Sequence, residues 1–202
     1  MNFVDNIFTT PKVVDLTDRN VLAAAFIDIG LTNFCVRVST YNRSNKKITT
    51  FHQENYHCKN SFKDLSLVLG ELKPVFEVLD FVVVESQVAK IAERNVRIMY
   101  YVFGALQQLV PDICIVCIRS QAKTKLLDAP KGMKGKEHKD WCYEKAMKIL
   151  DLSKDNSEYD AELIIRMSKM KKSGLNKRDD HGDVVCYCYV WWTMICEEFI
   201  SS

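Results

Sequence analysis

Four acidic residues begin or end apolar segments in distant parts of the chain. Asp28 closes the run AAAFI, and Glu85 closes the run FVVV. Asp180 and Asp183, within DDHGD, precede the run VVCYCYVWW. A carboxylate at the end of a buried strand is costly unless it is paired or binds a cation. The four acids therefore predict one acidic metal site assembled from three segments.

Magnesium suits such a site because Mg²⁺ prefers carboxylate oxygens and keeps several waters, which leaves room for phosphate oxygens. Two such ions about 3.5–4 Å apart can activate a water and stabilise the leaving oxygen of a phosphodiester. We therefore expect two Mg²⁺ per site, with Mn²⁺ able to substitute, bound by Asp28, Glu85, Asp180 and Asp183. No Ser/His/Asp set, P-loop or dinucleotide-binding glycine pattern competes with this interpretation.

The DDHGD motif taken alone also has a simpler interpretation. Asp180 and Asp183 lie three residues apart, on neighbouring faces of a first helical turn. Carboxylates in a first turn interact favourably with the helix dipole, and Asp179 or Asp180 would serve as an N-cap. His181 points about 100° away from Asp180 on a helix, so it is either an accessory ligand or a solvated residue. The two acids that end apolar strands are harder to explain in this way.

The composition indicates one globular domain without a strong overall charge. The chain has 202 residues, 48% of them hydrophobic, and a formal net charge of +2. Two stretches, 131–139 and 166–178, are locally basic and fit either a polyanion or solvated loops. The candidate DNA-binding residues are Lys134, Lys136, Lys171, Lys172, Lys177 and Arg178.

The eight cysteines lie mostly within apolar segments, which is typical of buried thiols in an intracellular protein. Residues 184–196 are too few to span a bilayer, and residues 88–110 carry several charges. Residues 1–20 contain three aspartates, unlike a transit peptide, and we expect them to form an N-terminal arm. Residues 21–202 would then form the single domain.

The hydrophobic pattern predicts an α/β fold. The first three predicted strands have short connections and are therefore expected to be antiparallel, whereas 80–85 is apolar on both faces and is expected to be central and parallel. The result is a mixed five-stranded sheet, three antiparallel and then two parallel strands, flanked by helices. The predicted strands are 22–29, 33–40, 47–54, 80–85 and 113–118; the helices are 61–73, 88–109, 137–150, 157–170 and 180–199; residues 119–136 are expected to be a loop.

The predicted helix over 88–109 has two apolar stripes rather than one. Apolar residues around so much of the circumference indicate burial on two sides, against the sheet and against a partner subunit. Met99 and Phe103 are the candidate outward positions in such a dimer. The alternative is a central helix covered entirely by its own chain.

The segments FIDIGLTN, VVVESQ and DDHGD, in this strand order, resemble the RuvC-type Holliday junction resolvases of the ribonuclease H superfamily. Within that group the chain is most similar to the poxvirus-type resolvases of large DNA viruses. Asp28, Gly30 and Asn33 match an aspartate-x-glycine-x-x-asparagine motif of that family. A mitochondrial resolvase is an alternative relative.

Two further motifs carry the resemblance. Glu85 matches a glutamate at the end of the fourth strand, although Ser86 stands where the viral family usually has arginine. Asp180 and Asp183 match an aspartate pair at the start of the last helix.

The resemblance implies a ribonuclease H-like fold and a homodimeric, Mg²⁺-dependent endonuclease that binds branched DNA. Such an enzyme resolves four-way junctions by paired symmetric nicks that leave a 5′-phosphate and a 3′-hydroxyl. It also implies a catalytic lysine near the start of the helix after strand five, for which Lys139 is the candidate and Lys136 the competitor. A viral enzyme would act in the host cytoplasm, and a cellular one in the mitochondrion or nucleus.

Two other functions remain open on this fold. One is a ribonuclease H acting on RNA–DNA hybrids, and the other is a non-catalytic nucleic-acid-binding protein. A scaffold would need none of the four acids, which argues against the second.

Overall fold

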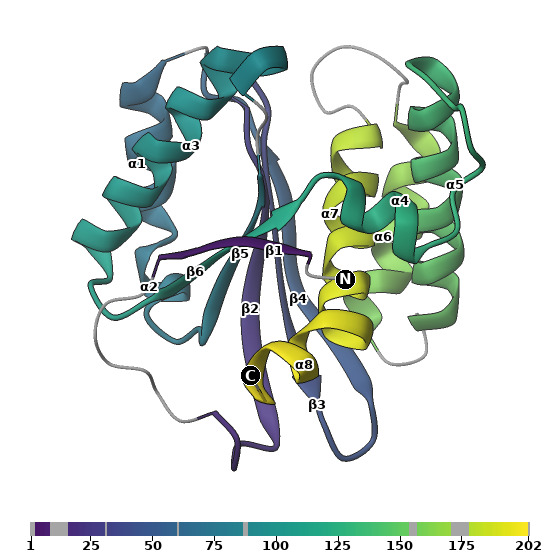
Figure 1. The fold of residues 1–202 in the computed structure, drawn as a ribbon, viewed down its shortest axis with the longest axis horizontal. Helices are drawn as coiled ribbons and strands as arrows, with labels where there is room; N and C mark the ends of the chain where they lie inside the picture. Colours follow the sequence, from purple (N-terminus) through teal and green to yellow (C-terminus); the bar gives the residue numbers. More distant parts are fainter. Residues whose placement is uncertain are drawn as a thin grey trace.

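A mixed sheet of six strands lies between two layers of helices in the computed structural model (Figure 1). The structure describes residues 3–8, 16–30, 32–59, 61–86, 89–153, 157–170 and 178–201. The strands are β1 (Val4–Phe8), β2 (Val21–Asp28), β3 (Phe34–Asn42), β4 (Lys47–Tyr56), β5 (Phe81–Ser86) and β6 (Cys114–Arg119). The helices are α1 (Phe62–Glu71), α2 (Lys73–Phe76), α3 (Ala89–Leu109), α4 (Gln121–Leu126), α5 (Lys136–Ser153), α6 (Glu158–Lys169), α7 (Arg178–Val190), the π-helical η2 (Trp191–Ile195) and α8 (Cys196–Ser201).

The sheet has the predicted mixed topology. Its order is β1-β6-β5-β2-β3-β4, with β2, β3 and β4 antiparallel and β5 parallel to both β2 and β6. The five expected strands are therefore confirmed as β2 to β6. The sixth strand, β1, comes from the stretch expected to be an arm and pairs antiparallel with β6. Without β1, the open hydrogen-bonding edge of β6 would face solvent.

The two helix layers bury opposite faces of the sheet. Figure 1 shows α1 and α3 on one side and α4 to α7 on the other. Because successive side chains of a strand point to opposite faces, Ala25 and Ile27 of β2 join the core under α1 and α3. Ala24 and Phe26 join the core under α7. None of the helices that the structure describes is long and apolar enough to cross a membrane.

Helix α3 buries much of its apolar surface against its own chain. Met99 and Phe103 are only 6% and 3% exposed. They share a core cluster with Leu65 and Leu69 of α1. The prediction that Met99 and Phe103 point outwards was therefore wrong, because both side chains pack into the core between α1 and the sheet.

A buried ion pair joins α6 to the sheet, which the sequence did not predict. Arg37 of β3 is 2% exposed and donates from Nη2 to Asp160 Oδ1 of α6 at 2.8 Å. Arg37 also donates to Gln53 Oε1 and Thr50 Oγ1, and Ser153 Oγ donates to Asp160 Oδ2 at 2.9 Å. The pair is thus surrounded by hydrogen bonds, which a buried ion pair requires to be tolerated.

Replacing Asp160 by alanine should destabilise the protein strongly, because the Arg37 charge would remain buried without its partner. The expected loss is about 3–5 kcal/mol in the free energy of unfolding, measured by urea denaturation. The control is Glu93→Ala, which removes an exposed partner of Arg97 on α3 and should cost no more than about 1 kcal/mol. Equal losses in the two variants would contradict this account of the buried pair.

Candidate active site

Two neighbouring parallel strands place Asp28 and Glu85 side by side. In the register of β2 and β5, Phe26 pairs with Val83 and Ile27 with Val84. The next step along both strands reaches Asp28 and Glu85. Phe26 and Val83 face the α7 core, and side chains alternate along a strand, so the two acids continue that same face. The sheet therefore presents both carboxylates towards α7.

Helix α7 supplies the other two acids from its first turns. It packs against β2, β3 and β4. Asp180 Oδ2 accepts a hydrogen bond from Asn55 Nδ2 of β4 at 3.1 Å. Asp183 Oδ1 accepts from Cys142 Sγ of α5 at 3.1 Å and from the Lys123 ammonium of α4. Each α7 carboxylate is thus oriented by a side chain from a different element.

The acids are close enough to perturb one another. Burial raises the pKa of Asp28 well above its usual range, and the charges of the three other acids raise it further. Burial also raises the pKa of Glu85, whereas the charge of Lys123 lowers it. The structure therefore brings together all four of the predicted acids. Concentrated negative charge of this kind is stabilised by added positive charge.

Lys123 is a central residue of the site that sequence reasoning missed. Residues 119–136 were expected to be a loop, which was wrong for Gln121–Leu126, where α4 forms. Ala122 and Leu127 are buried and anchor α4 against the α7 core. Lys123 is itself buried, pairs with Asp183, and lies with Nζ 4.7 Å from the centre of the Tyr187 ring. Burial alone would lower the pKa of Lys123, but the charge of Asp183 holds that pKa well above its usual range.

A signal for Lys123 existed in the resemblance. The family's lysine is expected near the start of the helix after strand five, and α4 is the helix that follows β6. Lys139 lies one helix later, is 55% exposed, and donates from Nζ to Asp179 Oδ2 at 2.6 Å. Asp179 is buried and lies in the first turn of α7, so Lys139 pairs with an acid beside the four predicted ones rather than with one of them.

The predicted DNA-binding residues are placed unevenly. Lys134 and Lys136 are exposed at and before the start of α5. Arg178 Nη2 donates to Asp140 Oδ1 at 2.8 Å, and the guanidinium lies 4.0 Å from the Tyr143 ring centre, so Arg178 joins α7 to α5. The other three candidates, Lys171, Lys172 and Lys177, lie outside the described residues.

His181 is buried, which corrects the interpretation of this residue as solvated. Its Nδ1 lies 3.0 Å from Gln53 Nε2, and Gln53 also accepts from Arg37. Burial, together with the charges of Arg166 and Arg37, lowers the pKa of His181 to about 4. The imidazole is therefore neutral at pH 7 and ties the first turn of α7 to the polar network around Arg37.

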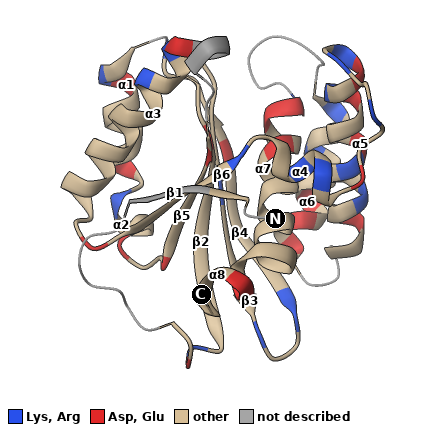
Figure 2. Cartoon of the chain, viewed as in Figure 1, with Lys and Arg blue, Asp and Glu red and all other residues tan. Residues whose placement is uncertain are grey.

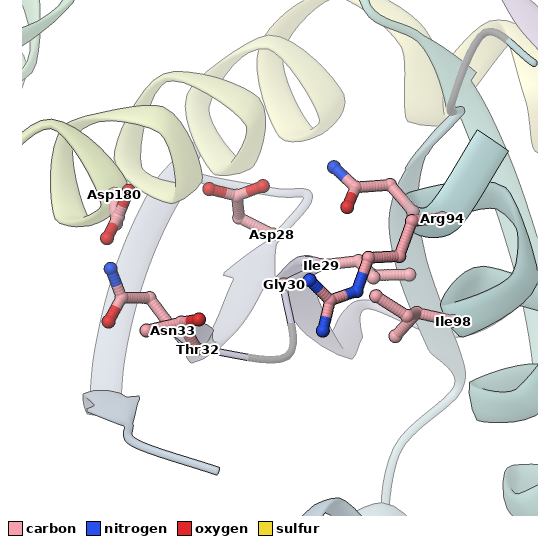
Figure 3. A pocket seen from close by; sticks show the side chains of 9 residues that line it. Asp28, Ile29, Gly30, Thr32, Asn33, Arg94, Ile98 and Asp180 are labelled. Atoms are coloured by element: carbon pink, nitrogen blue, oxygen red, sulfur yellow. The ribbon is translucent and has the colours of Figure 1, made fainter. Parts of the chain in front are cut away.

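A tight loop after β2 forms one wall of a pocket beside the acids. A Cβ at Gly30 would lie 2.5 Å from the Asn33 carbonyl oxygen, so only glycine permits this close approach. The pocket has a volume of about 290 Å³. Figure 3 shows the Asp28 and Asp180 side chains together with Asn33 around it.

The donor set fits a hard divalent cation. Four carboxylates meet at the end of the sheet, and Asn55 Oδ1 is a buried amide oxygen without a hydrogen-bond partner. Carboxylate and amide oxygens are the ligands that Mg²⁺ and Ca²⁺ select. In the described part of the chain, however, no three His, Cys, Asp or Glu side chains converge tightly enough to hold a metal ion as they stand. Lys123 pairs with Asp183 Oδ1, so a cation bound at that oxygen would compete with this ion pair.

No family model and no curated protein sequence matches this chain. Solved structures do match. The fowlpox virus Holliday junction resolvase aligns with a TM-score of 0.60 and 15% identity, covering 85% of this chain and 98% of its own. The yeast mitochondrial Holliday junction resolvase gives 0.58 and 13%, covering 88% and 84%. Thermus thermophilus RuvC gives 0.52 and 14%, covering 86% and 96%.

The likeness extends over most of each chain. At this identity it is a likeness of fold. The chain therefore has the ribonuclease H-like fold that the fowlpox virus, yeast mitochondrial and Thermus resolvases share, as its motifs predicted.

Proposed function

We propose that this protein is a metal-dependent endonuclease that resolves four-way DNA junctions by paired symmetric nicks. One observation carries the proposal. Carboxylates from β2, β5 and α7 meet at one end of the sheet, and the fold in which they meet is that of solved Holliday junction resolvases. Two of the similar structures hold Holliday junction DNA, one from Thermus thermophilus and one from fowlpox virus.

Asp28, Glu85, Asp180 and Asp183 would hold two Mg²⁺, for which Mn²⁺ would substitute. The bound ions would lower the pKa of a water and neutralise charge on the phosphodiester. The chain's own residues set the geometry. Asn55 orients Asp180, and Cys142 orients Asp183. Lys123 brings a permanent positive charge to the same place, where it would stabilise negative charge developing on the cut phosphate.

Basic residues near the site would bind the DNA backbone. Figure 2 shows lysines and arginines gathered on the layer that contains α4 and α5, beside the acidic start of α7. Lys134 and Lys136 are exposed there and suit phosphate contacts.

A ribonuclease H acting on RNA–DNA hybrids is the alternative on this fold. The eight free cysteines support an intracellular location.

Neutral variants of the acids should nearly abolish cleavage. Asp28→Asn, Glu85→Gln, Asp180→Asn and Asp183→Asn each remove a charge needed for cation binding while leaving junction binding largely intact. The assay incubates labelled four-way junction, linear duplex and RNA–DNA hybrid with Mg²⁺ in parallel. Asp112→Asn is the control, because Asp112 is exposed in the turn after α3. If an acid variant cuts at the rate of the control, the replaced residue is not a metal ligand. Preferential cleavage of the RNA–DNA hybrid by the wild-type protein would favour the ribonuclease H alternative.

The two lysines should respond differently. Lys123→Met keeps the side-chain volume but removes the positive charge that pairs with Asp183, so turnover should fall by roughly 10²–10³ while Ca²⁺ binds more tightly. Lys139→Ala should cause a smaller loss, because Lys139 is half exposed and pairs with Asp179. Single-turnover cleavage and calcium titration calorimetry measure the two effects. If Lys139→Ala loses more turnover than Lys123→Met, Lys139 is the catalytic lysine, as expected from the sequence.

The proposed homodimer would hold two active sites at a fixed separation, as paired cuts on opposing strands require. The outward face of α3 carries Tyr100, which is 57% exposed, and Gly104, where a Cβ would meet nothing within 4 Å. Tyr100→Glu should therefore give a monomer by sedimentation that nicks a cruciform plasmid without linearising it. Leu152→Glu, at an exposed apolar position on α5, is the control and should stay dimeric. A monomeric wild-type protein that linearises the cruciform would overturn the dimer proposal.

A further inference from the structure

The pocket beside the acids has two walls of opposite charge. Asp28 and Asp180 form one, and α3 contributes Arg94, Asn95 and Ile98 to the other. In Figure 3 the Arg94 side chain extends from α3 towards the loop at Gly30, facing the side where the two carboxylates lie. Of the residues that line the pocket, Arg94 alone carries a positive charge.

A ligand for such a pocket must interact favourably with both the carboxylates and the guanidinium. The carboxylate wall accepts cations, whereas a guanidinium offers a planar fork of donors that matches phosphate oxygens. Asn33 and Asn95 line the same pocket and add neutral amide donors and acceptors. A polyanion with regularly spaced phosphates meets both demands, because one phosphate can lie at the acids with their cations while the next meets the arginine.

We propose that Arg94, with Asn33 and Asn95, forms a subsite for the backbone phosphate next to the phosphate that is cut. This inference rests on the proposed function, and it specifies where the protein would hold the DNA strand. The subsite lies on α3, in the opposite helix layer from Lys123 and the basic residues of α5 (Figure 1). The strand would therefore be held from both sides of the catalytic acids, which limits its freedom to slide during the cut.

The neighbouring Arg97 provides a matched comparison on the same helix. Arg97 Nη2 bonds Glu93 Oε1 at 2.5 Å in an exposed i,i+4 pair and does not line the pocket. The two arginines carry the same charge three residues apart on one helix. Arg94 lines the pocket and Arg97 does not, which is the difference that the comparison uses.

The first experiment measures affinity for a fluorescent four-way junction in Ca²⁺ at several salt concentrations. Arg94→Gln should bind about tenfold more weakly, with the slope of log K against log salt reduced by about one. Arg97→Gln should match wild type in both quantities. Arg94→Lys should keep the salt slope but recover only part of the affinity, because lysine supplies charge without the fork. Wild-type affinity and slope in Arg94→Gln would overturn the subsite.

The second experiment locates the phosphate. Junctions carry single neutral methylphosphonates at successive positions around the crossover and the mapped cut. One substitution should weaken wild type and Arg97→Gln yet leave Arg94→Gln unaffected, because the partner charge is already missing. If the affinity loss caused by the methylphosphonate adds to the loss caused by Arg94→Gln at every position, the assignment of Arg94 to a phosphate is wrong.

The outcomes separate this inference from the proposed function. Protein that binds the junction in an Arg94-dependent way without cutting it would refute the nuclease and keep the subsite. Cleavage that is indifferent to Arg94 and to every neighbouring methylphosphonate would keep the nuclease and refute the subsite. Wild-type protein that binds no nucleic acid would refute both.

Discussion

Repulsion among partly buried carboxylates is the constraint to which the rest of the structure responds. Asp28 has its pKa raised by burial and by three neighbouring acids, so the folded chain holds these groups together at a cost in free energy. Two parallel strands cannot separate their last residues without breaking the register that pairs Ile27 with Val84. Lys123 offsets part of the repulsion from within the same cluster.

The position of α7 depends on polar as well as apolar contacts. Its apolar residues, including Val184 and Cys188, are buried against the sheet, but apolar burial is non-directional and does not by itself fix the position of the helix along its axis. Directional hydrogen bonds help to fix that position. Gln53 bonds His181 in the first turn and Arg37 beneath it, and Asn55 bonds Asp180. Because His181 is neutral at pH 7, it accepts this bond without adding a second buried positive charge beside Arg37.

The sequence predicted the elements and acids whose patterns are local. An acid at the end of an apolar strand is visible without any knowledge of tertiary structure, and the helix predicted over 61–73 begins where Ser61 caps α1. Features that depend on distant partners were not visible. Helix α4 has six residues and no side-chain cap, so its stability comes from packing rather than propensity. Arg37 looks like the solvent-facing residue of VRVST, and only α6 makes it a buried partner of Asp160.

The charges of the site give a physical reason to favour two divalent cations over one. Four carboxylates and the Lys123 ammonium leave a net of three negative charges in the cluster. One divalent cation would leave the cluster negative, and a phosphodiester would still be repelled. Two would make the cluster positive by a single charge, which equals the single negative charge of one phosphodiester. Ionised Asp28 is favoured only when such positive charge is near, so cation and phosphate binding would reinforce one another. Arg94 lies across the pocket from Asp28, where it would leave this balance for the cut phosphate intact and meet the next phosphate instead.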